Sequence, residues 1–342
     1  MISGDGIMKE VIEFLKKNDT EYQIGIINNG YFRKLPKPFE DKQVISFQWK
    51  KNSIDKLISN LTKSGVELIE KSSSKYNALY DIKGTENQIL VRYAVDSHVQ
   101  LPKLLLKNYR TGDDLFYIST KSNELIKTSA STYNTSFGYY SLWFEEHLSN
   151  KYESIISKII RSFKPFLTKE VTSFTLENLY EDINKLFLMS YIRSPEFVGE
   201  VNKNSLTSIL FDGGYDAEFL MITGEDMNDD YIKGYVPVPV VNESSKNFVT
   251  LKSLVSNLYI DGGINCMVML LHPKIAIALV PIDYYEKMIE EQGNGTYLKV
   301  SEENVVMKMN KQVYSCAKFR NDDVIGIKDD LEDLLKNIAD WK

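Results

Sequence analysis

Hydrophobic positions alternate or recur at helical spacing throughout the first 95 residues. Apolar residues spaced three and four apart predict a helix over residues 7–18. Short apolar runs predict strands over residues 21–27, 44–49, 66–70, 78–82 and 88–93. Ser53 suits the start of a further helix, which buries Leu57 and stops at Gly65. Together these elements predict an α/β module over residues 1–95.

Longer helical repeats mark the remainder of the chain. Pro102 predicts a helix start, because the first turn of a helix does not need its backbone N–H. Further helices are predicted over residues 145–163, 176–192, 250–258, 301–319 and 328–341. Strands are predicted over residues 115–119, 219–223 and 267–280. The expected fold class is therefore α+β, with the N-terminal α/β module followed by a core domain, residues 96–342, of helices and antiparallel-leaning sheet.

Composition fits an ordinary globular protein of two domains. The 342 residues are 43% hydrophobic and 26% charged, which excludes a disordered chain. The most apolar stretch, residues 266–281, is interrupted by a His-Pro-Lys turn and therefore predicts two buried strands instead of a membrane span. Cys266 and Cys316 lie in apolar segments, which indicates reduced thiols. The first residues lack a signal-like apolar run, so we expect a cytoplasmic protein with no membrane partner.

Four residues near the start of the core domain match the spacing of a known motif: Pro102, Leu106, Asn108 and Tyr109. They resemble the His-x-x-Pro-x-x-x-Leu-x-Asn-Phe opening of a bacterial domain family whose activity is unassigned, with Tyr in place of Phe. Similar segments continue in the same order at residues 148–163, 191–197, 221–226, 270–274 and 305–316. The resemblance covers about residues 98–325, and it implies no particular reaction.

The same resemblance suggests a candidate catalytic set of His98, Arg193 and Glu225. The family histidine aligns with Val99, and His98 lies one residue earlier. In such a set the His acts as acid or base, the Arg binds an oxyanion, and the carboxylate orients the imidazole or holds a metal. The alternatives are a helix-capping role for Arg193 and an unspecialised junction residue at His98.

Two sets of residues suggest a divalent cation as the cofactor. Glu225, Asp226 and Asp229 lie in one predicted loop, although its spacing is not that of a calcium loop. Asp81 and Lys83 form the acid-x-Lys arrangement with which metal-dependent nucleases position the attacking water. Asp-x-Lys-Gly is also an ordinary hairpin turn, so both interpretations stay open.

Charge is unevenly distributed along the chain, whose net charge is −6. Residues 1–175 hold 25 basic and 20 acidic side chains (+5), and residues 176–342 hold 16 and 27 (−11). Two cationic sets on predicted helices are candidates for contacts with nucleic-acid phosphates. They are Lys103, Lys107 and Arg110 on one helix, and Lys158, Arg161 and Lys164 on another. The alternative is that both sets are ordinary solvated helix faces.

These observations support two functional hypotheses. The first is a cytoplasmic bacterial or phage effector or regulator that acts on nucleic acid or its metabolism, as a nuclease or another hydrolase. The second is a non-catalytic binding module in which residues 1–95 recognise a protein partner. The sequence contains neither a Gly-x-Ser-x-Gly elbow nor a phosphate-binding glycine loop. Close approach of His98, Arg193 and Glu225 favours the enzyme, and wide separation favours the binding module.

Overall fold

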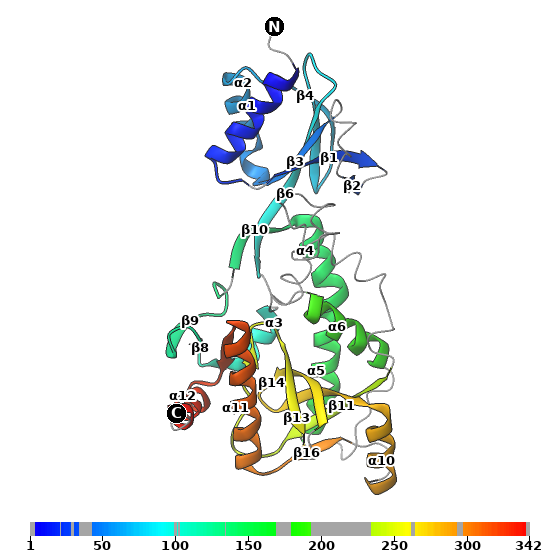
Figure 1. Cartoon of the computed structure of the whole chain (residues 1–342), viewed down its shortest axis with the longest axis vertical. Helices are drawn as coiled ribbons and strands as arrows, with labels where there is room; N and C mark the ends of the chain where they lie inside the picture. The colour runs from blue at the N-terminus through cyan, green and yellow to red at the C-terminus, as the bar shows by residue number, and fades with distance from the viewer. Residues whose placement is uncertain are drawn as a thin grey trace. The chain divides into compact units, whose positions relative to one another are not determined.

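The described residues of the computed structural model form two compact units (Figure 1). Unit 1 contains residues up to 97 together with 136–147, and unit 2 contains residues 98–135, 148–192 and 234–339. The structure describes residues 4–20, 22–28, 31–33, 43–98, 101, 103–133, 135–168, 179–192, 234–260, 264–292 and 297–339. Helices combined with mixed and antiparallel sheets confirm the predicted α+β class.

A mixed sheet forms the centre of unit 1, with the strand order β2-β1-β3-β6-β5-β4 and with β10 also paired to β6. Its strands are β1 (Tyr22–Asn28), β2 (Tyr31–Arg33), β3 (Val44–Trp49), β4 (Leu68–Ser73), β5 (Asn77–Ile82), β6 (Gln88–His98) and β10 (Thr135–Ser141). β3 and β6 run parallel, whereas β5 pairs antiparallel with both β6 and β4. The strands predicted over residues 44–49, 78–82 and 88–93 are confirmed.

Two helices, α1 (Gly4–Lys17) and α2 (Ile54–Lys63), pack against one face of this sheet. Side chains alternate between the two faces of a strand, so Ile45 and Phe47 of β3 reach the same core. That core also contains Met8, Val11, Leu15, Leu57, Leu61, Ala78, Tyr80, Ile82, Ile89, Val91 and Tyr93. α2 is followed by Gly65 at φ +88°, a backbone conformation that glycine adopts without a Cβ clash. The helix stop predicted there is confirmed.

Unit 1 is completed by α4 (Leu142–Leu148), whose residues 142–147 belong to it. Leu142 packs against the unit 1 core. The Tyr76 hydroxyl donates to Glu146 Oε2 at 2.9 Å, and Lys75 Nζ lies 2.5 Å from Glu146 Oε1. Hydrogen bonds from Lys75 and Tyr76 lower the pKa of Glu146. These contacts attach α4 to the segment that leads into β5.

Unit 2 contains two sheets that share one hydrophobic core. The first has the order β13-β14-β15-β11-β16, and the second joins β12, β17, β8, β7 and β9. The strands are β7 (Arg110–Thr111), β8 (Asp114–Ser119), β9 (Glu124–Ser129), β11 (Tyr235–Asn242), β12 (Thr250–Leu251), β13 (Val255–Ile260), β14 (Ile264–His272), β15 (Ile275–Pro281), β16 (Leu298–Val300) and β17 (Asp323–Gly326). The predicted strands over residues 115–119 and 267–280 are confirmed, the second as two strands and a turn.

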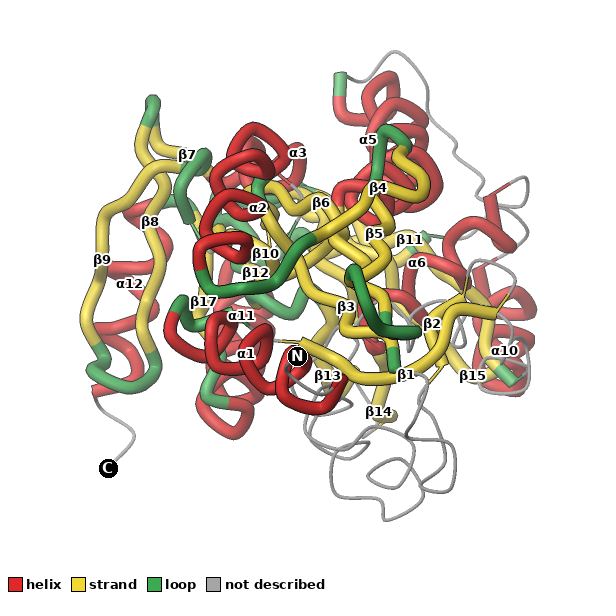
Figure 2. Tube along the Cα trace, turned by 90° about the horizontal axis from the view of Figure 1, so that it is seen from above, coloured by secondary structure: helices red, strands yellow, loops and turns green. Residues whose placement is uncertain are grey.

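Helices pack against both faces of the first sheet of unit 2. Figure 2 distinguishes the helices from the strands by colour. Val268, Ala278 and Val240 share a core with α11 (Glu303–Arg320) and α12 (Lys328–Ala339). The alternating residues Met269 and Ile277 are equally buried, and α5 (Ser154–Leu167) and α6 (Tyr180–Ile192) contact this sheet as well. α10 (Ile282–Gln292) contacts β15 and β11. The five-stranded sheet therefore lies between two helical layers.

The helix predicted over residues 145–163 is interrupted. α4 and α5 are separated by a π-helical segment, Ser149–Glu153, in which the hydrogen-bonded turn is wider by one residue. The buried stripe predicted for this region is present in α5, where Ile155, Ile156, Ile159 and Phe163 are buried. No helix in the part of the chain that the structure describes is long and apolar enough to cross a membrane.

The short helix predicted over residues 250–258 is wrong, because this segment forms β12 and β13 around a turn at Leu254. Leu254 has φ +69°, which no α-helix accommodates. The outer edge of β13 is covered by three side chains of α11 spaced four residues apart. Gln312 pairs with the Tyr259 backbone, Cys316 donates to Asn257 O at 3.1 Å, and Arg320 Nη1 donates to Val255 O at 2.6 Å. This tertiary ladder satisfies the edge of the strand.

Candidate functional site

Most of the candidate catalytic set lies outside the described residues. His98 is the last residue of β6, and its side chain is not described. Arg193 and Glu225 lie outside the described residues, as do the candidate metal ligands Asp226 and Asp229. This part of the site therefore stays a prediction from the sequence.

The acid-x-Lys candidate in unit 1 is described, and its two side chains point to different partners. Gln88 Nε2 donates to Asp81 Oδ1 at 2.8 Å, and Lys71 Nζ lies 3.7 Å from the same oxygen. Lys83 Nζ binds both carboxylate oxygens of Glu67, at 2.8 and 2.9 Å. Lys83 is thus neutralised by Glu67 and does not bind Asp81. Among the residues with described side chains, no three His, Cys, Asp or Glu residues gather into a metal-binding group.

The first cationic set does not lie on one helix face, which corrects the sequence prediction. α3 (Lys103–Leu106) is short, a 3-10 turn covers Lys107–Tyr109, and Arg110 already belongs to β7. The physical reason is the anchoring of Tyr109. Its side chain is fully buried and its hydroxyl donates to Leu270 O at 3.0 Å, while Asn108 Nδ2 donates to Leu271 O at 3.3 Å. These contacts pull the chain out of helical conformation.

Lys107 and Arg110 differ in their exposure to solvent. The Lys107 side chain is exposed, whereas Arg110 is half-buried and its Nε is shielded from solvent without a hydrogen-bond acceptor. The side chain of Lys103 is not described. The described part of the cationic set is therefore one exposed ammonium and one partly desolvated guanidinium.

The second cationic set is present on the exposed side of α5. Lys158, Arg161 and Lys164 are exposed, opposite the buried stripe of this helix. Lys158 Nζ lies 3.1 Å from Asp182 Oδ2 of α6. Within the described residues, Arg161 and Lys164 have no carboxylate within ion-pair distance. Two unneutralised cations therefore lie one turn apart on this helix.

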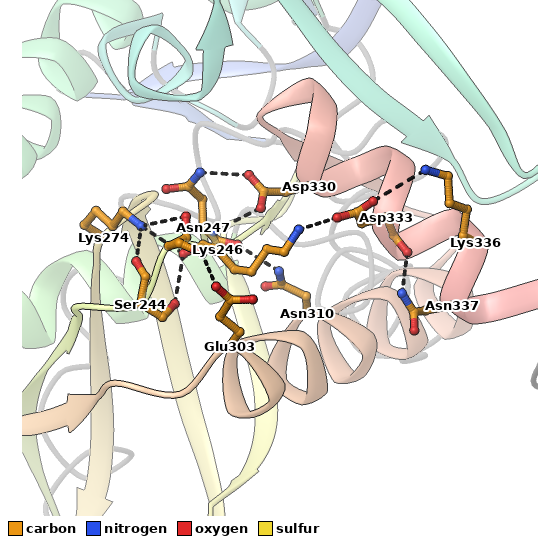
Figure 3. Close-up of polar contacts among 11 residues, drawn as sticks. Ser244, Lys246, Asn247, Lys274, Glu303, Asn310, Asp330, Asp333, Lys336 and Asn337 are labelled. Atoms are coloured by element: carbon orange, nitrogen blue, oxygen red, sulfur yellow. Dashed lines mark hydrogen bonds and ion pairs between the residues drawn. The ribbon is translucent and has the colours of Figure 1, made fainter.

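A polar group joined by many hydrogen bonds was not found from the sequence. It surrounds Lys274, in the turn between β14 and β15 (Figure 3). Lys274 Nζ donates to Ser244 O at 2.8 Å and to Lys246 O at 2.9 Å, and Ser245 O lies at 3.5 Å. Burial lowers the pKa of Lys274, but three carbonyl oxygens around one ammonium stabilise its charged form. The ammonium has no free lone pair for nucleophilic chemistry.

Further hydrogen bonds tie the loop over residues 243–249 to α11 and α12 (Figure 3). The buried carboxylate of Asp330 accepts from Asn247 N at 3.1 Å and from Asn247 Nδ2 at 2.8 Å. Asn310, which is also fully buried, donates to Asn247 O at 2.8 Å and accepts from Val249 N at 3.0 Å. Each of these polar groups has a partner, so the network is suited to fixing the loop.

At the periphery of this network lie an ion pair, a further hydrogen bond and a half-buried histidine, His272. Lys246 pairs with Asp333, and Ser245 donates to Glu303. His272 Nδ1 accepts the Lys274 backbone N–H at 3.1 Å. Burial, and then the charge of Lys274, lower the pKa of His272, so the imidazole is neutral at pH 7. The chemistry of the group is that of a structural polar core.

This polar group could not be predicted from a sequence pattern. Its members come from the end of β11, a loop, a hairpin and two helices, and their types are common surface types. Two segments of the family resemblance, residues 270–274 and 305–316, contain members of this group.

Comparison with known proteins adds no function to this geometry. The chain matches no protein-family model, no curated protein and no solved structure. The resemblance to the bacterial domain family therefore stays an expectation from the sequence, and the function must be inferred from the described side chains.

Proposed function

We propose that the protein is a cytoplasmic regulator of bacterial or phage origin that binds nucleic acid through the exposed side of α5. The observation that supports this most directly is the pair Arg161 and Lys164, exposed and without an acidic partner in the described residues. Unneutralised cations on one helix face contribute to phosphate binding by releasing counterions from the nucleic acid. Lys158, although paired with Asp182, extends the same face.

The proposal assigns no catalytic role to Asp81 and Lys83 of unit 1. Asp81 is held by Gln88 and Lys71, and Lys83 is held by Glu67. Lys83 is directed to Glu67 and not to Asp81, which weighs against an acid-x-Lys mechanism in unit 1. The hydrolase version of the proposal depends on His98, Arg193 and Glu225, and the assay below includes it.

The test is binding of the full chain to single- and double-stranded DNA and RNA, measured by fluorescence anisotropy between 50 and 200 mM salt, concentrations over which phosphate-contacting proteins lose affinity. The double variant Arg161→Glu/Lys164→Glu is compared with Lys308→Glu/Lys318→Glu, which reverses the same number of charges at exposed lysines of α11. We expect the double variant to bind more weakly and its log–log salt slope to fall by about two units. Equal binding by the double variant and the wild type would overturn the proposal.

The same samples are incubated with magnesium or manganese to test for cleavage. Metal-dependent cleavage that disappears in Asp81→Ala, or in Glu225→Ala, would replace the binding proposal with a nuclease and assign the active unit. Binding without cleavage supports the regulator.

A protein-binding module is the second candidate, supported by the edge strand β4 of unit 1. β4 is the last strand on its side of the sheet, its residues after Leu68 are exposed, and Ile69 keeps 50% of its surface accessible. Such an edge offers backbone groups to a partner strand, although the bulge at Lys71 weakens it. Failure of the chain to bind any nucleic acid in the assay moves the proposal to this candidate.

A further inference from the structure

The strand β4 forms an open edge of the sheet in unit 1. Among the described strands it is the outermost on its side, and every residue after Leu68 is exposed. The backbone N–H of Lys83 donates to Glu67 O at 2.9 Å, so Glu67 is bonded toward the β5 hairpin. Hydrogen-bonded positions alternate in an antiparallel ladder, so the N–H and C=O of Leu68 and Glu70 point away from β5. These groups are oriented to bond with an added strand.

The same edge carries an apolar residue on the face of the sheet opposite α1 and α2. Ile69 pairs with Asp81 of β5, whose neighbours Tyr80 and Ile82 point into the core beneath the helices. Side chains alternate along a strand, so Ile69 and Asp81 point to the other face. The Ile69 side chain is 50% exposed. A strand added to this edge would bury it, and burial of apolar surface is favourable.

Opposite charges flank Ile69 at equal distance along the chain. Glu67 lies two residues before it and Lys71 two residues after it, with side chains 59% and 54% exposed. Lys71 reaches the same face as Ile69, because its Nζ lies 3.7 Å from Asp81 Oδ1. Glu67 binds Lys83, but a carboxylate has lone pairs for more than one cation. The order of acid, isoleucine and base is therefore complementary to its own reverse.

We propose that β4 pairs with β4 of a second copy of this chain, antiparallel about a two-fold axis at Ile69. Ile69 then packs on Ile69 of the partner subunit, and Leu68 exchanges backbone hydrogen bonds with Glu70 of the partner subunit. Lys71 lies opposite Glu67 of the partner subunit, and the axis repeats this pair on the other side. Residues 68–70 precede the bulge at Lys71, so the paired segment is regular.

The neighbouring two-fold registers are less favourable. An axis at Glu70 places two identical carboxylates opposite each other, and like charges in this position are destabilising. An axis at Leu68 places Ile69 opposite Glu67 of the partner subunit, which leaves the isoleucine without an apolar contact. Charge that is symmetric about one apolar residue is what pairing with a second copy requires, whereas a strand of a different protein does not need it.

The test is sedimentation velocity of the full chain without nucleic acid, at about 10 μM to about 1 mM protein, because an interface below roughly 1,200 Å² is weak. We expect a monomer–dimer equilibrium. Ile69→Lys should weaken the dimer about tenfold or more, since it replaces the apolar contact at the axis by two ammonium groups. The matched control is Ile282→Lys, at a 41% exposed isoleucine of α10, which should sediment like the wild type.

Reversal of the flanking charges tests the register. Glu67→Lys or Lys71→Glu alone opposes like charges across the axis and should weaken the dimer about threefold or more. The double variant Glu67→Lys/Lys71→Glu restores opposite charges across the axis, so dimerisation should recover. Within one chain, this double variant loses the attraction of Glu67 to Lys83 and of Lys71 to Asp81. Recovery therefore reports pairing between chains and not repair of the fold.

Three results would overturn the inference: a monomer at every concentration, wild-type dimerisation by Ile69→Lys, or no recovery in the charge-reversed double variant. The first leaves the edge to a strand of another protein. The substituted residues are exposed, and equal melting temperatures of the variants and the wild type confirm that the fold is retained. The inference goes beyond the α5 proposal and does not depend on it, so Arg161→Glu/Lys164→Glu should dimerise like the wild type.

Discussion

At the scale of single residues, the charged side chain of Lys274 holds the loop over residues 243–249 in place. Its ammonium is surrounded by the carbonyl oxygens of residues 244–246, which would otherwise have to be satisfied by water. Such use of all three N–H donors is compatible with structural stability and leaves no donor for a substrate. Lys107 and Lys164 differ from Lys274 because they have no hydrogen-bond or ion-pair partner in the described residues.

Lys274→Met should lower the free energy of unfolding by about 2 kcal/mol, because carbonyl groups of the 243–249 loop lose a charged donor. The matched control is Lys299→Met, which removes a half-exposed lysine paired with Glu243 at 2.5 Å. A surface pair of this kind contributes little to stability, because solvent screens it. Urea unfolding followed by circular dichroism measures both. Equal effects of the two substitutions would contradict the role assigned to Lys274.

His272 should make stability depend on pH in a defined window. Its pKa in the folded protein is lowered from the ordinary 6.5 by burial and by Lys274, so the unfolded chain binds a proton more readily. The stability from the neutral imidazole is complete above pH 6.5 and decreases as the pH falls toward the folded pKa. Urea unfolding between pH 7.5 and 5.5, a range chosen above the usual carboxylate pKa values, should show this loss in the wild type. His272→Gln should show less of it; an identical pH profile would reject the assignment.

At the scale of elements, Gly326 at the end of β17 permits α12 to approach the core. A Cβ at this position would lie 2.9 Å from Val249 Cγ1 and 3.2 Å from Leu331 side-chain carbons. Gly326→Ala should therefore destabilise the protein by roughly 1–3 kcal/mol through overpacking. Gly234→Ala, where a Cβ meets nothing within 4 Å, is the control and should change stability little. Thermal unfolding of both variants tests this, and matching melting temperatures would refute it.

Elements whose pattern is local were predicted well, and those held by distant partners were not. α2 ends just before Gly65 as expected, and β5 and β8 lie where alternation placed them. The segment over residues 250–258 has helical spacing, yet it forms strands because α11 satisfies the edge of β13. The helix after Pro102 ends early because Tyr109 is anchored to Leu270. In both cases the deciding contact comes from far along the chain.

At the scale of the whole molecule, the chain folds as two units, each with a hydrophobic core of its own. In unit 1 the core lies between α1, α2 and a mixed sheet, and in unit 2 it joins two sheets to α11 and α12. The candidate cations Lys107, Arg110, Arg161 and Lys164 all belong to unit 2. The nucleic-acid face proposed above is therefore a property of that unit.

The sequence by itself determined the α+β class, the positions of most strands and helices, and the existence of cations exposed on α5. Those features follow from local periodicity and from residue type, which neighbouring residues in the chain define. Only the tertiary structure decided which charges are neutralised. It brought Lys83 to Glu67, Lys274 to the loop carbonyls and Asp330 to Asn247. The reason is physical: the energy of a charge depends on its burial and on partners that folding brings from distant segments.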